Sequence, residues 1–207
     1  ASDIIMVFLA IETTSMPLYI LSGFLTSEKK SVESGVKYFL YGAATSTVML
    51  FGFSYIYGLT GTTNLYDIGI AMNSGYVPEI VMAATLFLVL VGFGFKISAV
   101  PFHFWAPDVY EGAPTPVAGF LSTASKAAGF AVLMRVLSVI FPAVTPVWST
   151  IISILAAASM ILGNFVALAQ KNIKRLLAYS SIAQAGYMLI GVAAGNSLGL
   201  SGASYYL

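Results

Sequence analysis

Apolar segments long enough to cross a membrane recur along this chain of 207 residues, and they constrain its fold more than any other feature. Each needs about 20 residues, because a helix rises 1.5 Å per residue and the hydrocarbon core is ~30 Å thick. Only 8% of the residues are charged, against about 25% in soluble domains. We therefore predict an all-α, polytopic bundle of transmembrane helices. The expected spans are residues 3–26, 36–59, 79–101 (broken, continuing over 102–111), 113–141, 147–169, 176–195 and, in part, 199–207.

The connections between these spans carry most of the polar residues. Residues 61–75 are too polar to span and are expected to form a short interfacial segment. Lysine and arginine gather around residues 29–37 and again around residues 171–175, whereas the connections expected on the opposite side contain neither. An even number of crossings separates the two basic clusters. Both should therefore lie on one side, which the positive-inside rule identifies as the cytoplasm or its equivalent.

Both ends of the chain fall close to or within apolar segments. The chain does not begin with Met, no basic region or cleavage site marks a signal peptide, and Leu207 lies inside the last apolar run. We expect residues 1–207 to form a single transmembrane domain, truncated at both ends relative to a longer protein.

Several classes of function are excluded by composition. The chain has no cysteine and one histidine, so thiolate or histidine-built metal sites are not expected. A net charge of +1 offers no electrostatic surface for nucleic acid. The sequence also lacks the glycine-rich fingerprint of dinucleotide-binding proteins. We expect no metal and no cofactor in this chain, with the lipid bilayer as its surroundings.

Three ionisable residues remain well inside apolar spans, namely Glu12, Lys96 and Lys126. A charge at the centre of a bilayer costs roughly 2.5–3.5 kcal/mol on insertion scales, so such residues usually face a bundle interior or water and carry function. They are the leading candidates for a site that moves ions. Glu12 needs protonation, water or a partner, and Lys37 is one lysine that could hold it charged.

Lys126 is the clearest of the three. It lies ten residues after Pro116 and sixteen before Pro142, so about 15 Å and 24 Å of helix flank it. One interpretation is a structural lysine paired with a buried carboxylate. The favoured one is a lysine that gains and loses a proton, because burial removes the water that stabilises an ammonium. The small polar neighbours that could order water around it are Ser122, Thr123 and Ser125.

Residues 100–116 contain four prolines and cannot form an unbroken helix. Irregular backbone at membrane depth is tolerated where it is packed in protein or lines water, and broken helices beside ionisable residues form ion pathways in transporters. Pro101 and Pro107 are expected to break the helix, next to His103, whose imidazole titrates nearest neutral pH. Two simpler interpretations remain: an ordinary interfacial loop anchored by aromatic side chains, and a Lys96 whose side chain reaches the membrane surface.

Several short segments follow one another in a recognisable order: GFKISAVPFH at 94–103, Trp105, PDVY at 107–110, GAP at 112–114, ASK at 124–126 and NIKRLLAYSS at 172–181. These segments resemble the antiporter-like membrane subunits of respiratory complex I. The match covers nearly the whole chain in the same order, and the sequence of residues 100–110 resembles the N-type subunit (subunit 2) more than the L or M type.

The resemblance implies a fold of about fourteen helices built from two inverted five-helix repeats, of which this chain would cover the fifth helix to the start of the eleventh. It implies a proton relay through Glu12, Lys37, Lys96 and Lys126, with His103 beside them. Gln184 departs from the family, because many relatives have a histidine there, and an amide orders water but does not titrate. The charged residue expected on the twelfth helix lies beyond Leu207.

By the same resemblance, the protein would be a proton-translocating subunit of a complex that couples oxidation of NAD(P)H or another donor to reduction of quinone. Its partners would be the other membrane subunits, and FMN or iron–sulfur clusters would sit elsewhere in the complex. A bacterial cell membrane is the expected location, with an organelle inner membrane or a thylakoid as alternatives. The competing functions are an Mrp-type cation/proton antiporter, which a sodium transport assay would distinguish, and a non-translocating scaffold, which leaves the three buried charges unexplained.

Overall fold

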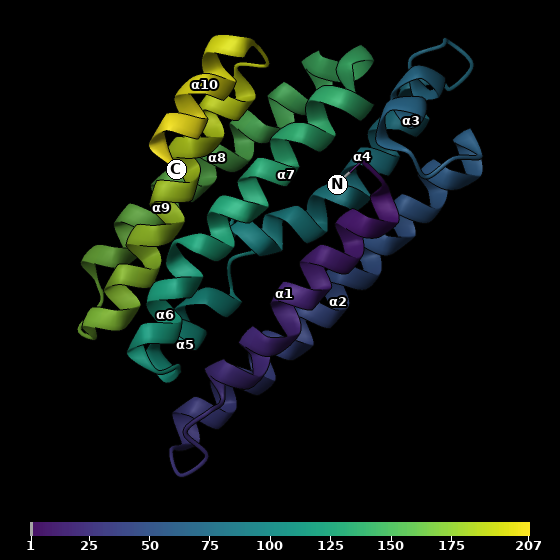
Figure 1. Cartoon of the computed structure of the whole chain (residues 1–207). Helices are drawn as coiled ribbons and strands as arrows, with labels where there is room; N and C mark the ends of the chain where they lie inside the picture. The colour runs from purple at the N-terminus through teal and green to yellow at the C-terminus, as the bar shows by residue number, and fades with distance from the viewer. Residues whose placement is uncertain (1) are drawn as a thin grey trace.

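The computed structural model describes residues 2–207, and these residues form helices joined by short connections, without a strand (Figure 1). Six of the helical segments within the described range are long and apolar enough to cross a membrane. The predicted all-α membrane fold is confirmed. The helices are α1 (Ile4–Ser22), α2 (Lys29–Thr60), α3 (Leu65–Met72), α4 (Glu79–Ile97), α5 (Trp105–Gly112), α6 (Thr115–Ser122), α7 (Ala124–Ile140), the short 3-10 helix η1 (Pro142–Val144), α8 (Thr145–Leu168), α9 (Ile173–Ala193) and α10 (Ser197–Tyr206).

Short polar side chains set where several helices begin. The carboxylate of Asp3 accepts hydrogen bonds from the amides of Ile5 and Met6, at 2.8 and 3.2 Å, and so caps α1. Asn64, Asn172 and Asn196 do the same for α3, α9 and α10. These caps occupy amides that have no partner inside the helix, which is why asparagine and aspartate are favoured there.

The predicted interfacial segment is the helix α3. Its residues Leu65, Ile68 and Met72 are fully buried, and the helix packs against α7. The guanidinium of Arg135 on α7 donates to the hydroxyl of Tyr66 at 3.0 Å. This contact supports a structural role for Arg135.

The expected break in the third span occurs, but it begins earlier than the prolines. Helix α4 ends at Ile97, and Ser98 adopts a left-handed conformation with φ 59°. The amides of Ser98 and Ala99 donate back to the carbonyls of Phe95 and Gly94, at 3.0 and 2.8 Å, which is the Schellman pattern that ends a helix. The irregular segment between α4 and α5 contains Pro101, as predicted, but the helix ends about one turn before this proline.

Pro107, unlike Pro101, does not lie in a break. It lies within the first turn of α5, where amides have no helical acceptor, so its missing N–H costs nothing. Its expected role as a second break was wrong.

The span expected over residues 113–141 is interrupted at Thr123, between α6 and α7. Thr123 has φ −117° and ψ −87°, outside the helical region. The hydroxyls of Ser122 and Thr123 both donate to the carbonyl of Gly119, at 2.8 and 3.0 Å, and so compete with the backbone for that acceptor. The interruption leaves Lys126 in the first turn of α7.

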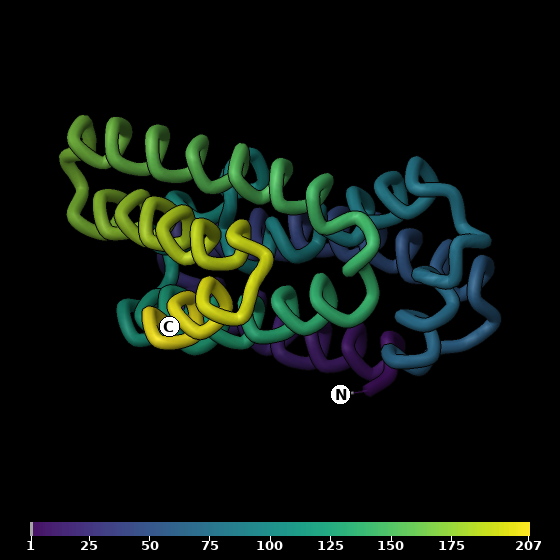
Figure 2. Tube along the Cα trace, turned by 90° about the horizontal axis from the view of Figure 1, so that it is seen from above, coloured from purple at the N-terminus to yellow at the C-terminus, as the bar shows by residue number. Residues whose placement is uncertain are grey.

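The helices form three adjacent groups. In Figure 1, α5, α6 and α7 lie between the pair α1–α2 and the group α8–α9–α10. Figure 2 shows α8 and α9 running side by side along their length, in agreement with their extensive contacts. The central group brings the broken segment and the start of α7 between the outer helices, where two clusters of buried apolar side chains surround them.

Candidate functional site

Lys96 lies in the last turn of α4, and its side chain is directed into the bundle. Only 4% of the residue is exposed. Its amine donates to the hydroxyl of Ser15 at 2.9 Å and lies 3.4 Å from that of Thr14, both on α1. The aliphatic stem packs on α7, where a Cβ added to Gly129 would lie 3.1 Å from Lys96 Cγ. The alternative in which Lys96 reaches the membrane surface is not what the structure shows.

Glu12 lies two residues before Thr14 on the same helix. Its carboxylate accepts a hydrogen bond of 2.5 Å from the hydroxyl of Ser46 on α2. The amine of Lys96 reaches the same helix three residues further on, at Ser15. The suggested partner Lys37 binds other carboxylates instead, so the Glu12–Lys37 pairing was wrong.

Lys126 is almost completely enclosed, with 2% of the residue exposed. Its amine donates to the hydroxyl of Ser181 at 2.7 Å and to the carbonyl of the same residue at 2.9 Å, both on α9. These partners are neutral. The interpretation as a structural lysine paired with a carboxylate therefore finds no support in the contacts that hold the amine.

The two lysines point in different directions. Lys96, at the end of α4, reaches α1, whereas Lys126, in the first turn of α7, reaches α9. The structure thus places Glu12 and Lys96 in one group at α1, and Lys126 in a second group at α9.

The remaining predicted residues lie around these two groups. His103 is buried in the connection between α4 and α5, its ring 4.5 Å from that of Phe104, and its Nδ1 has no partner within residues 2–207. Ser125 is buried beside the phenol of Tyr38. Gln184 lies one turn after Ser181 on α9 and accepts a hydrogen bond from the Tyr206 hydroxyl on α10.

Lys37 belongs to an ionic network at one end of the bundle. Its amine lies 2.5 Å from Asp108 and 2.6 Å from Glu33. The guanidinium of Arg175 also binds Asp108, at 2.5 Å, and binds Glu111 at 3.0 Å. Two carboxylates of α5 therefore join α2 to α9, and we call this network, with Lys30, the α5 clasp.

The α5 clasp also tests the predicted topology. Lys30 and Asn172 both donate to the same oxygen of Glu111, at 2.6 and 3.2 Å, so the two basic connections meet at one end of the bundle. The prediction that they share a side is confirmed. The hydrogen bond from Lys30 holds the pKa of the Glu111 carboxyl below its usual range; burial opposes this shift, and Arg175 adds to the lowering.

The sequence analysis did not identify Asp108, Glu111 and Arg175 as members of an ionic network. A signal existed, because Asp108 and Glu111 are three residues apart and share one face of a helix, while both basic clusters were expected at the same membrane surface. The described part of the chain brings together no group of three His, Cys, Asp or Glu side chains able to hold a metal ion.

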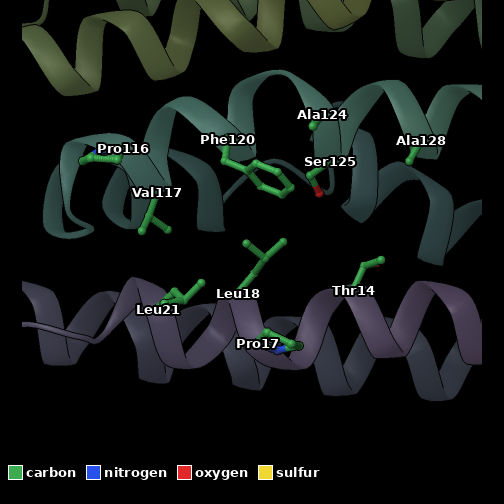
Figure 3. A pocket seen from close by; sticks show the side chains of 10 residues that line it. All are labelled: Thr14, Pro17, Leu18, Leu21, Pro116, Val117, Phe120, Ala124, Ser125 and Ala128. Carbon is green, nitrogen blue, oxygen red and sulfur yellow. The ribbon is translucent and has the colours of Figure 1, made fainter.

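A large apolar cavity separates α1 from α6 and α7. Its volume is about 540 Å³, and Figure 3 shows Leu18 and Phe120 pointing into it from opposite walls. Its only hydroxyls are those of Thr14 and Ser125, each next to one of the lysine groups. A chain of water needs two to four polar partners per molecule, so this cavity does not provide a polar route between them.

A second cavity, of about 380 Å³, lies between α5, α6 and α9; its surface is mostly apolar, although several of its residues carry hydroxyl groups. It reaches Ser181, the residue that holds Lys126. Buried lysines and a broken helix inside a membrane bundle place the chain in the class of polytopic membrane proteins with discontinuous helices.

The chain belongs to the family described as the transmembrane region of NADH:quinone oxidoreductase and the Mrp antiporter, whose model matches residues 1–207. It is 52% identical over 215 residues to NADH-quinone oxidoreductase subunit N of Chlorobium chlorochromatii, covering 100% of this chain and 42% of that protein. It is 49% identical to NAD(P)H-quinone oxidoreductase subunit 2 of Prochlorococcus marinus (strain AS9601), covering 100% of this chain and 40% of that protein. The chain therefore spans less than half the length of these relatives, and the resemblance to the N-type subunit is confirmed.

Solved structures show the same fold. A chain of respiratory complex I from Thermus thermophilus matches with a TM-score of 0.80 and 41% identity, over 96% of this chain and 43% of that one. A chain of the Mrp complex from Dietzia sp. matches with a TM-score of 0.87 and 25% identity, over 99% of this chain and 38% of that one.

Proposed function

We propose that this chain is part of a proton-translocating membrane subunit of an NAD(P)H:quinone oxidoreductase, in which buried lysines pass protons while quinone is reduced elsewhere. The observation that carries the proposal is Lys126, enclosed to 98% and held by the neutral groups of Ser181 alone. A cation without a counter-charge inside a membrane is costly, so a lysine kept there has a use for its proton.

The two groups of the site have different tasks in this proposal. Lys96 and Glu12 meet the same part of α1, where Ser15 accepts a hydrogen bond from the amine of Lys96 and the hydroxyl of Ser46 on α2 donates to the carboxylate of Glu12. Lys126 is the single proton carrier between these two residues and the second half of the protein. His103, buried at the break, lies near enough to the irregular backbone to exchange protons with water there.

Lys37 has a different part in the proposal. Its two carboxylate partners keep it charged at the end of the bundle, so it holds α5 in place and is not a carrier. The basic connections that flank it are proposed to face the cytoplasm.

The wider complex would supply what this chain does not. FMN and iron–sulfur clusters would lie in other subunits, and the partners would be neighbouring membrane subunits of the same complex. The relatives in Chlorobium and Prochlorococcus favour a bacterial energy-coupling membrane. An Mrp-type antiporter remains the second candidate, because the Dietzia chain shares the fold at 25% identity. Sodium-dependent transport without quinone reduction would support it.

The test replaces Lys126 in the full-length subunit within the assembled complex. Lys126→Met removes the titratable group and should abolish or severely reduce quinone reduction and proton uptake in vesicles together. Lys126→Arg keeps the charge but should still impair both, because a guanidinium stays protonated at physiological pH. Lys171→Met, at an exposed position of the connection before α9, is the matched control and should behave like wild type.

The rates are normalised to the amount of assembled complex. A structural lysine would give another pattern, in which arginine restores activity and methionine mainly lowers assembly. If both Lys126 variants assemble and pump like wild type, Lys126 is not on the pathway and the proposed function loses its main support.

A further inference from the structure

The backbone between α4 and α5 has left the helical conformation, so its amides need acceptors from elsewhere. The amides of Ser98 and Ala99 turn back to α4, as described above. The next amide, that of Val100, donates to the hydroxyl of Ser159 on α8 at 2.9 Å. In an unbroken helix, the acceptor of this amide would be the carbonyl of Lys96, four residues earlier. Ser159 therefore takes the place of a helical carbonyl, from 59 residues away in sequence.

This hydrogen bond lies deep inside the bundle. Ser159 is fully buried, and Val100 follows the buried Lys96 by four residues and precedes the buried His103 by three. An amide without a partner at membrane depth is costly, and irregular backbone is tolerated there where protein or water supplies the missing partners. The hydroxyl of Ser159 supplies one such partner to the segment that joins two candidate site residues.

Ser159 differs in this respect from two other hydroxyl residues of α8. Thr150 and Ser153 donate to the carbonyls of Pro146 and Ser149 in their own helix, at 2.8 Å each, as threonine and serine commonly do inside helices. The hydroxyl of Ser159 accepts a hydrogen bond from a different segment. Its contact therefore joins α8 to the break.

The helix that carries Ser159 is packed closely on α9. A Cβ added to Gly163 would lie 2.8 Å from the amide nitrogen of Ala183. One added to Gly186 would lie 2.9 Å from the carbonyl oxygen of Ala156. These two glycines let the backbones of α8 and α9 approach each other, and Figure 2 shows the two helices side by side along their length. We call this pair of helices the α8–α9 frame.

The α8–α9 frame contacts both lysine-bearing segments through one serine on each helix. Ser181 of α9 holds the amine of Lys126 at 2.7 Å. Ser159 of α8 holds the backbone four residues after Lys96. The frame is therefore a common support for the two lysine groups, through a side-chain amine in one case and through the main chain in the other.

We propose that Ser159 is a positioning residue, whose hydroxyl fixes the irregular segment to the α8–α9 frame and so keeps Lys96 directed toward Ser15 on α1. Its effect on turnover rests on the proposed function, because Lys96 is one of the lysines that would pass protons. The effect on the backbone of the break is independent of that function and is measured without turnover.

The test replaces Ser159 in the full-length subunit of the assembled complex. Ser159→Ala removes the acceptor without adding volume, and it leaves the amide of Val100 without this partner. Loss of such a partner shifts an equilibrium by about 5–150-fold, so the amide of Val100 should exchange with deuterium faster by that factor. The measurement is mass spectrometry of the peptide that contains residues 98–104. The peptides of α8 should keep the wild-type rate, which a general loosening of the helix would not allow.

Quinone reduction and proton uptake, normalised to assembled complex, should fall in the same variant. A misplacement of about 1 Å far from the chemistry can cost about 10²-fold, so we expect a loss between about fivefold and a hundredfold. Ser153→Ala is the matched control, since it removes another hydroxyl of α8 that donates within its own helix. It should match wild type in both exchange and turnover.

Two variants of nearly equal shape separate the hydrogen bond from packing, because threonine carries a hydroxyl and valine does not. Ser159→Thr should retain more turnover and slower exchange than Ser159→Val. Equal losses in these two variants would overturn the inference, and so would wild-type exchange or wild-type turnover in Ser159→Ala. A Ser159→Ala complex that does not assemble would make the hydroxyl a requirement of folding and would reject the positioning role as well.

The outcome is separable from that of the proposed function. Loss of turnover in Lys126→Met, with normal turnover and exchange in Ser159→Ala, would reject this inference and leave the proposed function standing.

Discussion

Lys37 could either hold α5 in place through its ion pairs or carry protons in the relay. Replacing Lys37 distinguishes these two roles, because they predict losses of activity of different size. The side chains of Lys37 and Asp108 are 36% and 31% exposed, and that of Glu33 is 58% exposed. Pairs of this exposure contribute about 0.2–1 kcal/mol each after solvent screening. Glu33 lies on α2 together with Lys37, so only the Lys37–Asp108 pair joins α2 to α5. Losing that pair in Lys37→Met should therefore cost at most about 1 kcal/mol in the docking of α5, or about a fivefold change in an equilibrium constant.

Asp108 would not be left alone in that variant. Arg175 still binds its other oxygen at 2.5 Å, so no uncompensated buried charge is created. We expect Lys37→Met to lose no more than about fivefold in turnover, and Lys37→Arg to match wild type. A carrier of protons would behave differently, since removing a positioned proton-transfer group typically costs about 10²–10⁴-fold.

The assay is quinone reduction and proton uptake in vesicles, normalised to assembled complex, with Lys29→Met as a control at an exposed position of the same connection. A loss of turnover of a hundredfold or more in both Lys37→Met and Lys37→Arg would refute the reasoning. Lys37 would then belong to the relay, as the resemblance to the family first implied.

Three further outcomes follow from the same contacts. The ion pairs of Glu111 should stabilise the docking of α5 at any pH above the ordinary glutamate pKa of about 4.3, and this stabilisation should be lost as the pH falls through the lowered pKa of Glu111. The emission of Trp105, measured in a Trp148→Phe background, should therefore shift only in that acid range. Gly112→Ala should disturb α5 far more than Gly58→Ala, whose added Cβ meets open space, and equal assembly of the two variants would contradict the packing described. Single-cysteine labels placed near Lys30 and Lys171 should react from the same side of the membrane, and reaction from opposite sides would overturn the topology.

Periodicity and composition were enough to predict the membrane helices, because a bilayer permits few alternatives to a helix of fixed length. The interruption at Thr123 was not predictable in this way. It depends on two hydroxyls competing for one carbonyl, and serine and threonine occur inside many helices without interrupting them. The end of α4 was predicted about one turn too late for a similar reason. Proline is a recognisable helix breaker in a sequence, whereas the left-handed conformation of Ser98 has no sequence signal.

The candidate site was likewise predictable only in part. The burial of Glu12, Lys96 and Lys126 could be predicted from their positions in apolar segments, but their hydrogen-bond partners could not. Ser181 holds Lys126 from a helix 55 residues away in sequence, and such a contact depends on how helices pack.

The short helix α5 connects the two lysine groups and can couple them. One connection joins it to α4, which carries Lys96, and the two residues 113–114 join it to α6 and the segment that leads to Lys126. A displacement of α5 therefore acts on both lysine groups at once through the covalent chain. Energetic coupling between two sites is reciprocal, so any state of Lys126 that favours one position of α5 must also change the strength of the ion pairs at the bundle end by the same free energy. Within the proposed complex, a subunit bound at that end would then respond to the charge of a lysine that it does not contact.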